Sequence, residues 1–300
     1  MSSKKPHPIQ LVINDASTFL GTGITTKFDI KEEARKTILY GKKIGEEIDG
    51  SLLGFPGYKF QIRGGSDIAG FPHIKGIPGP ALKNIFRSGP PGYRPRKYRI
   101  EKKTGGYKII NLKGVKIKKT VRGEELSERT RQVNLIILER SGKAIEEMTE
   151  EEILSDKILA EIAYKLGKTI MKWGVAAPEI IENGNPTPLG EKLKEVGLGD
   201  EVLDTLYRKL GIRLLKLGEN RKKTIEPLRK VSKRKPHPLG RYIAWVMYNL
   251  YQQLKNGEKS TSEPEKLAEE IAEQIMDGIN KWLNGEMKKP PKISFKIKEE

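Results

Sequence analysis

The sequence predicts an α+β protein in which a small β-barrel-like domain over residues 1–145 precedes an all-α domain over 146–288 and a charged flexible tail at 289–300. Three observations lead to this prediction. Apolar residues alternate with period two up to about residue 140, glycine and proline are dense between residues 41 and 92, and apolar residues recur at the helical period after Gly142. A chain of 300 residues is also long enough for two domains, each with its own core.

Short strands are expected throughout the N-terminal part. The run at 9–14 is apolar, and alternation predicts further strands near 24–30, 58–62, 115–117 and 133–137, with a short helix at 31–40. Of the 31 glycines, 12 lie between residues 41 and 92, together with six prolines. Glycines and prolines at this density divide the chain into short strands and turns, as in a small barrel.

The C-terminal part has the pattern of amphipathic helices. Thr149 and Glu152 have the spacing of a capping box, which predicts that a helix begins there. Apolar stripes predict longer helices at 158–173, 200–217, 239–255 and 265–283, and a shorter one at 189–196. We expect these stripes to form the core of a helical domain rather than a surface for a partner.

The positive charge is concentrated in the N-terminal part. The chain has 57 Lys/Arg and 39 Asp/Glu, a formal charge of +18, and residues 1–140 hold 28 of the basic and 13 of the acidic side chains. Between residues 83 and 122 there are 14 Lys/Arg and one acidic residue, Glu101. Because so uneven a distribution attracts polyanions, it predicts a nucleic-acid partner. No apolar run is long enough to span a membrane, no basic amphipathic helix suits a membrane surface, and no secretory leader is expected.

Residues and motifs that commonly form catalytic or metal-binding sites are scarce in this sequence. Cysteine is absent, and no phosphate-binding glycine loop or combination of nucleophile and base is apparent. His7, His73 and His237 lie beside prolines and are expected to be solvated or stacked on RNA rather than to bind metal. Asp49 and Asp67 lie beside or near glycines and are expected to cap turns rather than to form a catalytic pair. We therefore predict no enzyme, no cofactor, no metal and no small-molecule substrate.

Candidate RNA-binding residues lie on glycine- and proline-rich stretches with basic side chains. Arg94, Arg96 and Lys97 follow a proline-fixed backbone, and Tyr93 is an aromatic residue among cations, suited to stacking. Segment 221–235, with eight Lys/Arg and one Glu, is interpreted as a basic connector between helices that makes a second RNA contact. The full set of candidates is Lys42, Lys43, Gly64, Gly65, Ser66, Arg87, Tyr93, Arg94, Arg96, Lys97, Arg99, Lys116, Lys118, Lys119, Arg122, Lys222, Lys223, Lys233, Arg234 and Lys235. The Gly64–Gly65 pair is expected to include at least one positive φ angle.

Five motifs occur in an order that resembles one family. They are GKKIGEEIDG at 41–50, GY at 57–58, GGSD at 64–67 with GFP at 70–72, GPPGYRP at 89–95 and KTVRG at 119–123, followed by the strand QVNLIILE at 132–139. Over about residues 9–145 the chain resembles the S6e family of archaeal and eukaryotic small-subunit ribosomal proteins. It departs from the family's pattern at Asp15, which is not followed by the usual proline, and at His73, where methionine is common. Residues 98–114 look like an insertion with a turn at Gly105–Gly106, and residues 150–300 resemble no part of the family.

The resemblance implies a barrel-like domain that binds small-subunit ribosomal RNA, lies among neighbouring ribosomal proteins in the cytoplasm and has no catalytic activity. The abundance of Lys and Glu with only six Gln is typical of thermophilic proteins and agrees with an archaeal source. Two alternatives stay open. One is an RNA-processing or RNA-modifying enzyme whose helical half is catalytic or accessory, and the other is a chromatin-type protein that prefers duplex DNA.

Overall fold

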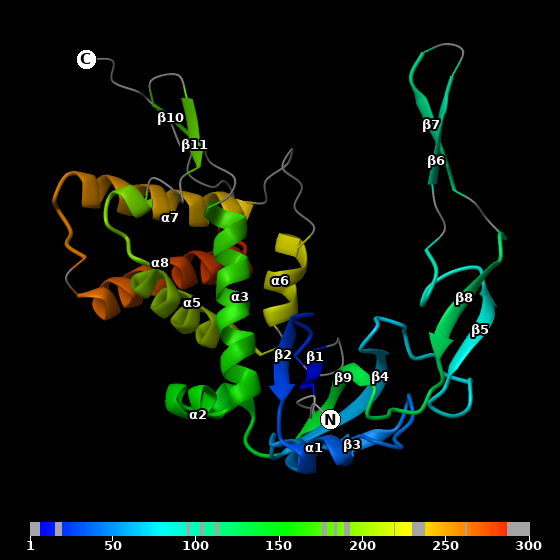
Figure 1. Cartoon of the computed structure of the whole chain (residues 1–300). Coiled ribbons are helices and arrows are strands. Elements are labelled where there is room, and N and C mark those ends of the chain that lie inside the picture. The colour runs from blue at the N-terminus through cyan, green and yellow to red at the C-terminus, as the bar shows by residue number, and fades with distance from the viewer. Residues whose placement is uncertain are drawn as a thin grey trace, which may run out of the picture. The chain divides into compact units, whose positions relative to one another are not determined.

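The computed structural model describes residues 7–15, 20–94, 97–102, 105–111, 114–175, 179–182, 185–188, 193–218, 220–229, 238–261 and 263–286. Its contacts divide the chain into two compact units (Figure 1). Unit 1 comprises Met1–Phe19 and Thr25–Gly142, and unit 2 comprises Leu20–Ile24 and Lys143–Glu300.

A five-stranded sheet is the centre of unit 1. Its order is β2-β1-β9-β4-β3. Strand β1 pairs with β9 in parallel, whereas the other pairs in this sheet are antiparallel. The strands span Ile9–Asn14 (β1), Thr25–Ile30 (β2), Glu47–Asp49 (β3), Tyr58–Asp67 (β4) and Thr130–Arg140 (β9).

Period-two patterns explain the core of this sheet. Val133, Leu135 and Ile137 alternate along β9 and are fully buried, as are Phe60 and Ile62 on β4. The predicted strands near 9–14, 24–30, 58–62 and 133–137 are therefore confirmed, and the expected helix at 31–40 is α1 (Glu33–Thr37). The barrel-like closure is not confirmed, because β2 and β3 form the two edges of an open sheet among the described strands.

Two further pairs of strands belong to unit 1 and are missing from the sequence prediction. The strand expected near 115–117 overlaps β8 only at Ile117. Strands β5 (Leu82–Arg87) and β8 (Ile117–Arg122) form an antiparallel pair, here called the ribbon. Strands β6 (Lys97–Glu101) and β7 (Tyr107–Asn111) form the hairpin. Because Arg87 at the end of β5 pairs with Ile117 at the start of β8, the hairpin leaves from that end of the ribbon.

Unit 2 consists mainly of helices. These are α2 (Glu150–Ser155), α3 (Lys157–Val175), α5 (Asp200–Leu215), α6 (Asn220–Arg229), α7 (Pro238–Lys255) and α8 (Pro264–Leu283). The apolar stripes are buried as predicted, with Ile158, Ile162, Leu166 and Ile170 of α3 at 1% exposure or less. The capping box at Thr149 and Glu152 is also confirmed, with both reciprocal hydrogen bonds present.

Two features of unit 2 differ from the prediction. Strands β10 (Glu179–Glu182) and β11 (Asn185–Pro188) form an antiparallel hairpin, so the unit is not entirely helical. Helix α6 occupies much of the segment that the sequence predicts as a connector, because Arg221, Thr224 and Ile225 are buried at its inward side. Of the helix expected at 189–196, residues 189–192 lie outside the described residues, and residues 193–195 are helical.

Candidate nucleic-acid interface

The register of the ribbon sorts its side chains onto two faces. Residues directly opposite each other in an antiparallel pair point to the same side. One face carries Phe86 opposite Lys118, Asn84 opposite Thr120, and Leu82 opposite Arg122, while the other carries Arg87 opposite Ile117, Ile85 opposite Lys119, and Lys83 opposite Val121. Lys83, Lys118 and Lys119 are exposed, as is Lys116 just before β8. Neither strand contains an acidic residue, so the ribbon presents positive charge from both faces.

Arg122 anchors the ribbon and does not face solvent. Its side chain is 7% exposed, and Nε donates to Asp67 Oδ2 at 2.8 Å while Nη1 donates to the Pro80 carbonyl at 2.8 Å. Its backbone N–H donates to the Pro72 carbonyl, and its carbonyl accepts from Ile74. The prediction of Arg122 as an RNA contact is corrected, because its guanidinium is used inside the protein.

Asp67 and His73 complete this buried anchor. Asp67 Oδ1 accepts from the Phe71 backbone N–H at 2.7 Å, so the turn-capping role predicted for Asp67 is confirmed. Ser51 N–H donates in the same manner to Asp49 Oδ1, which confirms that prediction as well. His73 is 3% exposed, so the expectation that it is solvated or stacked on RNA is wrong.

The tautomer of His73 follows from its neighbours. Nδ1 lies 2.8 Å from the Gly123 carbonyl oxygen, which can only accept, so Nδ1 carries the proton. Nε2 then accepts from Thr130 Oγ1 at 3.1 Å. Burial is the largest cause that lowers the pKa of His73, and the nearby Arg122 charge lowers it further. The ring is held neutral as part of the anchor.

The proline-rich loop after β5 is held by Arg87. Its guanidinium donates from Nη2 to the Pro90 carbonyl at 2.9 Å and from Nε to the Pro91 carbonyl at 3.2 Å. Tyr93 is 8% exposed, with Lys119 Nζ 6.0 Å from its ring centroid. Tyr93 therefore supports Lys119 by a cation–π contact, and its predicted role in base stacking is corrected. Arg94 is exposed.

The hairpin is closed by the two glycines that the sequence singled out. Gly105 and Gly106 have φ angles of +79° and +84°, and Lys102 N–H donates to the Gly106 carbonyl at 2.9 Å. The expected turn is thus confirmed. Arg99 pairs with Ile109 and Lys97 with Asn111, whereas Arg96 lies outside the described residues.

The candidates at residues 42–43 and 64–66 lie elsewhere in unit 1. Gly64, Gly65 and Ser66 belong to strand β4, not to a loop, and neither glycine has a positive φ angle. What requires a glycine is the close approach of β9, because a Cβ on Gly65 would lie 2.5 Å from the Gln132 carbonyl oxygen. Lys43 is exposed, and Lys42 Nζ lies 3.5 Å from Glu46 Oε2.

The basic candidates of unit 2 are described only in part. Lys222 and Lys223 are in α6, and the side chain of Lys223 is exposed. Lys233, Arg234 and Lys235 lie outside the described residues. Arg221, in the same segment, is buried, and its Nη1 donates to the Leu20 carbonyl at 3.4 Å. A second RNA contact from this segment thus stays a prediction that rests on Lys222, Lys223 and residues 233–235.

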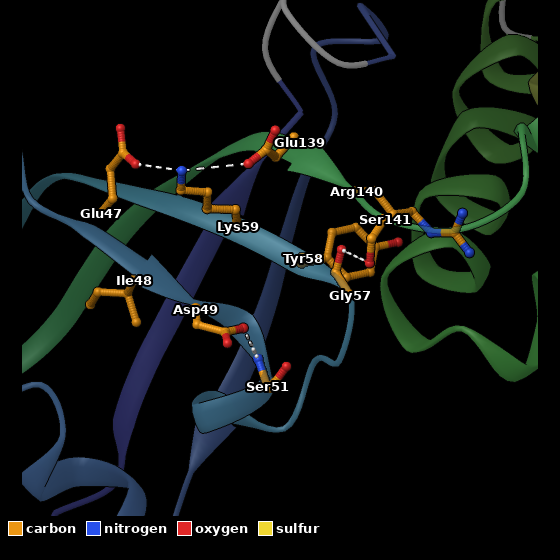
Figure 2. A pocket seen from close by; sticks show the side chains of 10 residues that line it. All are labelled: Glu47, Ile48, Asp49, Ser51, Gly57, Tyr58, Lys59, Glu139, Arg140 and Ser141. Carbon is orange, nitrogen blue, oxygen red and sulfur yellow. Dashed lines mark hydrogen bonds and ion pairs between the residues drawn. The ribbon is translucent and has the colours of Figure 1, made fainter.

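A surface depression lies at the β3–β4 side of the sheet (Figure 2). Lys59 Nζ lies 2.9 Å from Glu47 Oε2 and 3.5 Å from Glu139 Oε1, and these two partners raise the pKa of Lys59. Ser141 Oγ donates to the Gly57 carbonyl at 3.3 Å, so its hydroxyl is not paired with a base. In the described part of the chain, no group of three His, Cys, Asp or Glu side chains could hold a metal ion. The depression contains paired charges rather than a catalytic combination.

Two residues of the ribbon were missed by sequence reasoning. Lys83 and Phe86 are on β5, which the sequence did not predict as a strand. The run LKNIFR does not alternate between apolar and polar residues, and it has exposed side chains on both faces, so no core side marks it as a strand. Across the described residues, no helix is both long and apolar enough to cross a membrane.

Comparison with known proteins identifies the family. The family model described as ribosomal protein S6e matches residues 10–104. The small ribosomal subunit protein eS6 of Methanocaldococcus jannaschii is 39% identical over 116 residues, which cover 39% of this chain and 77% of that protein. The corresponding protein of Pyrobaculum arsenaticum is 35% identical over 159 residues, covering 48% of this chain and 94% of that protein. The chain belongs to the ribosomal protein S6e family.

The S6e relatives differ in length from this chain. The eS6 protein of Hyperthermus butylicus is 44% identical over 100 residues, which cover 33% of this chain but only 39% of that protein. Among these three relatives, the alignments cover at most 48% of this chain. All three are archaeal small-subunit proteins by name, and the enzyme alternative finds no support among them.

Proposed function

We propose that this S6e-family chain is a structural constituent of the small ribosomal subunit and joins it by binding ribosomal RNA through the ribbon and the hairpin. The observation that carries the proposal is the set of exposed lysines at 83, 118 and 119 on a ribbon without acidic residues, with Lys116 exposed just before β8. Phosphate contacts from such cations position a protein on RNA, while the shape of the RNA supplies selectivity. The names of the S6e relatives, which are small-subunit proteins, agree with this role.

The proposed interface consists of the following basic residues. The exposed cations of the ribbon and its loop are Lys83, Arg94, Lys116, Lys118 and Lys119. Arg96, Lys97 and Arg99 are proposed as further contacts by their place in the sequence, at the start of the hairpin. Arg87 contributes charge while it holds the proline loop. Residues 1–145 are proposed as the RNA-binding domain and 146–288 as an appended domain. Lys42 and Lys43 are proposed as secondary contacts, and so is the set Lys222, Lys223, Lys233, Arg234 and Lys235.

The salt dependence of RNA affinity tests this proposal. A variant of the full chain replaces the five cations at 83, 94, 116, 118 and 119 by Gln, and its affinity for small-subunit ribosomal RNA is measured over a range of salt concentrations. Removing one cation that binds a phosphate is expected to reduce the slope of log affinity against log salt by about 0.7 to 0.9. Duplex DNA of equal length serves as a competitor, and we expect it to compete poorly.

A matched variant controls for net charge. Lys157, Lys168, Arg208, Arg241 and Lys266 are exposed cations on helices of unit 2, and their replacement by Gln removes the same charge. This variant should keep nearly the wild-type slope. Equal slopes for the two variants would mean that the ribbon is not the RNA-binding surface.

A further inference from the structure

Among the large hydrophobic residues whose exposure the structure describes, Phe86 is the most exposed, at 70%. A single exposed apolar side chain is common on protein surfaces and needs no explanation by itself. What distinguishes Phe86 is its place in the ribbon, where the strand opposite presents Lys118 on the same face.

The neighbouring pair of residues on this face of the ribbon adds a side-chain link between the two strands. Asn84 and Thr120 lie opposite each other, and Thr120 Oγ1 donates to Asn84 Oδ1 at 2.8 Å. This side-chain hydrogen bond joins the two strands beside Phe86, in addition to the backbone pairing. The face therefore offers an aromatic ring next to a cation on a two-stranded support.

The chemistry of this face favours RNA over an apolar protein surface. A protein partner that covered Phe86 would also remove Lys118 from water, and a cation buried without a partner is costly. RNA instead supplies a phosphate for the cation and an unpaired base for the ring. Stacking on aromatic side chains is how proteins commonly hold unpaired bases beside phosphate contacts.

We propose that Phe86 stacks on an unpaired base of ribosomal RNA while Lys118, on the same face, neutralises an adjacent phosphate. This inference rests on the proposed function and adds to it a site for a nucleobase. Stacking by Phe86 would make the ribbon prefer RNA with loops or bulges over uninterrupted duplex. Phosphate contacts alone do not provide this preference.

The test uses the full chain and two RNAs of equal length, a small-subunit fragment with unpaired bases and a perfect duplex. Phe86→Leu removes the aromatic ring but keeps an apolar side chain, and Phe86→Tyr keeps the ring. We expect F86L to weaken binding of the looped RNA by about 5- to 150-fold, the range for removal of one stacking interaction, with an unchanged salt slope. F86Y should bind nearly as wild type, and the duplex should not distinguish the variants.

Two further measurements separate this inference from the function on which it rests. Lys118→Gln should reduce the salt slope by about 0.7 to 0.9 while leaving the Phe86 effect in place. Ultraviolet crosslinking of the wild-type complex should join Phe86 to a nucleotide. If F86L binds looped RNA as wild type and no crosslink forms, while the five-cation variant still has a reduced slope, the stacking site is refuted and the proposed function stands.

The remaining outcomes are also decisive. If neither F86L nor the five-cation variant changes RNA binding, the proposed function itself falls. If F86L binds naked RNA normally but fails to join protein-containing subunits, Phe86 contacts a ribosomal protein, and the stacking proposal is overturned.

Discussion

At the residue scale, two adjacent glycines of β4 have different structural requirements. A Cβ on Gly65 would lie 2.5 Å from the Gln132 carbonyl oxygen, whereas a Cβ on Gly64 would lie 3.9 Å from Asn134 Nδ2. Gly65→Ala must therefore push β9 away from β4, and we expect it to lower the free energy of unfolding of unit 1 by about 1 to 3 kcal/mol, as overpacking does. Gly64→Ala should change it by less than about 0.5 kcal/mol.

Amide hydrogen exchange in β4 and β9 measures this difference where it arises. Tryptophan fluorescence would not, since Trp173, Trp245 and Trp282 all belong to unit 2. Equal protection of the β4 and β9 amides in the two variants would contradict the role given to the close approach of these strands.

His73 makes the stability of unit 1 depend on pH. Because burial lowers its pKa below the ordinary value of 6.5, the unfolded chain binds a proton more tightly than the folded chain does. Unfolding takes up that proton between the lowered pKa and 6.5, so the free energy of unfolding falls as the pH falls through this window. Above it, the His73 ring is neutral in both states and its contribution is constant.

The variant His73→Met isolates this contribution. It cannot titrate, so the part of the pH dependence below 6.5 that comes from His73 should disappear, although removing the hydrogen bonds to Gly123 and Thr130 lowers stability at every pH. Denaturation with urea at several pH values gives the comparison. A variant with the same pH dependence as the wild type would show that His73 is not held neutral by the fold.

At the element scale, two glycines allow α3 and α5 to cross closely. A Cβ on Gly211 of α5 would lie 1.9 Å from the Ala163 carbonyl oxygen of α3, and a Cβ on Gly167 of α3 would lie 2.0 Å from the Tyr207 carbonyl oxygen of α5. In an isolated helix, Gly→Ala would stabilise by about 1 kcal/mol. Here Gly211→Ala should instead destabilise unit 2 by about 1 to 3 kcal/mol, because the helices must separate.

Thermal or chemical unfolding followed by tryptophan fluorescence reports on this unit. Arg208→Ala, at an exposed position on the same helix, serves as the control and should have little effect on stability. If G211A is as stable as R208A or more so, the close crossing does not hold the two helices together.

The same scale shows what the sequence could predict. The apolar run of β1, the alternation of β9 and the stripes of α3, α5, α7 and α8 are local patterns, and each is buried in the structure. Strand β5 has no such pattern, because it has exposed side chains on both of its faces. Its partner β8 begins 30 residues after β5 ends, so the pairing cannot be read from neighbouring residues either. Helix α6 was missed because its charged sequence NRKKTIEPLR resembles a linker.

The candidate site was predictable to a similar degree. The density of charges predicted a basic region between residues 83 and 122, and Lys83, Lys116, Lys118 and Lys119 are exposed there. It could not separate Arg122 from Lys119, three positions apart, because Arg122 is buried by Asp67, which lies 55 residues away in the sequence. Tyr93 and His73 were misjudged for the same reason, as their burial depends on residues distant in the chain.

At the scale of the whole molecule, the chain joins an S6e-like unit to a helical unit with a different charge balance. Residues 1–140 have an excess of 15 positive charges, and residues 141–300, with 29 Lys/Arg and 26 Asp/Glu, have an excess of 3. The proposed binding to RNA is therefore expected mainly from unit 1. The segment from Lys222 to Lys235 is the place where unit 2 would add to it.

Sedimentation of the full chain in a lysate of the cells that make it tests the central claim most directly. The wild-type chain should travel with the small ribosomal subunit at moderate salt and leave it at high salt, because its attachment depends on phosphate contacts. The variant with Gln at positions 83, 94, 116, 118 and 119 should remain near the top of the gradient, while the matched variant of unit 2 should still travel with the subunit. A wild-type chain that stays at the top of the gradient, or that sediments with DNA instead, would contradict the account.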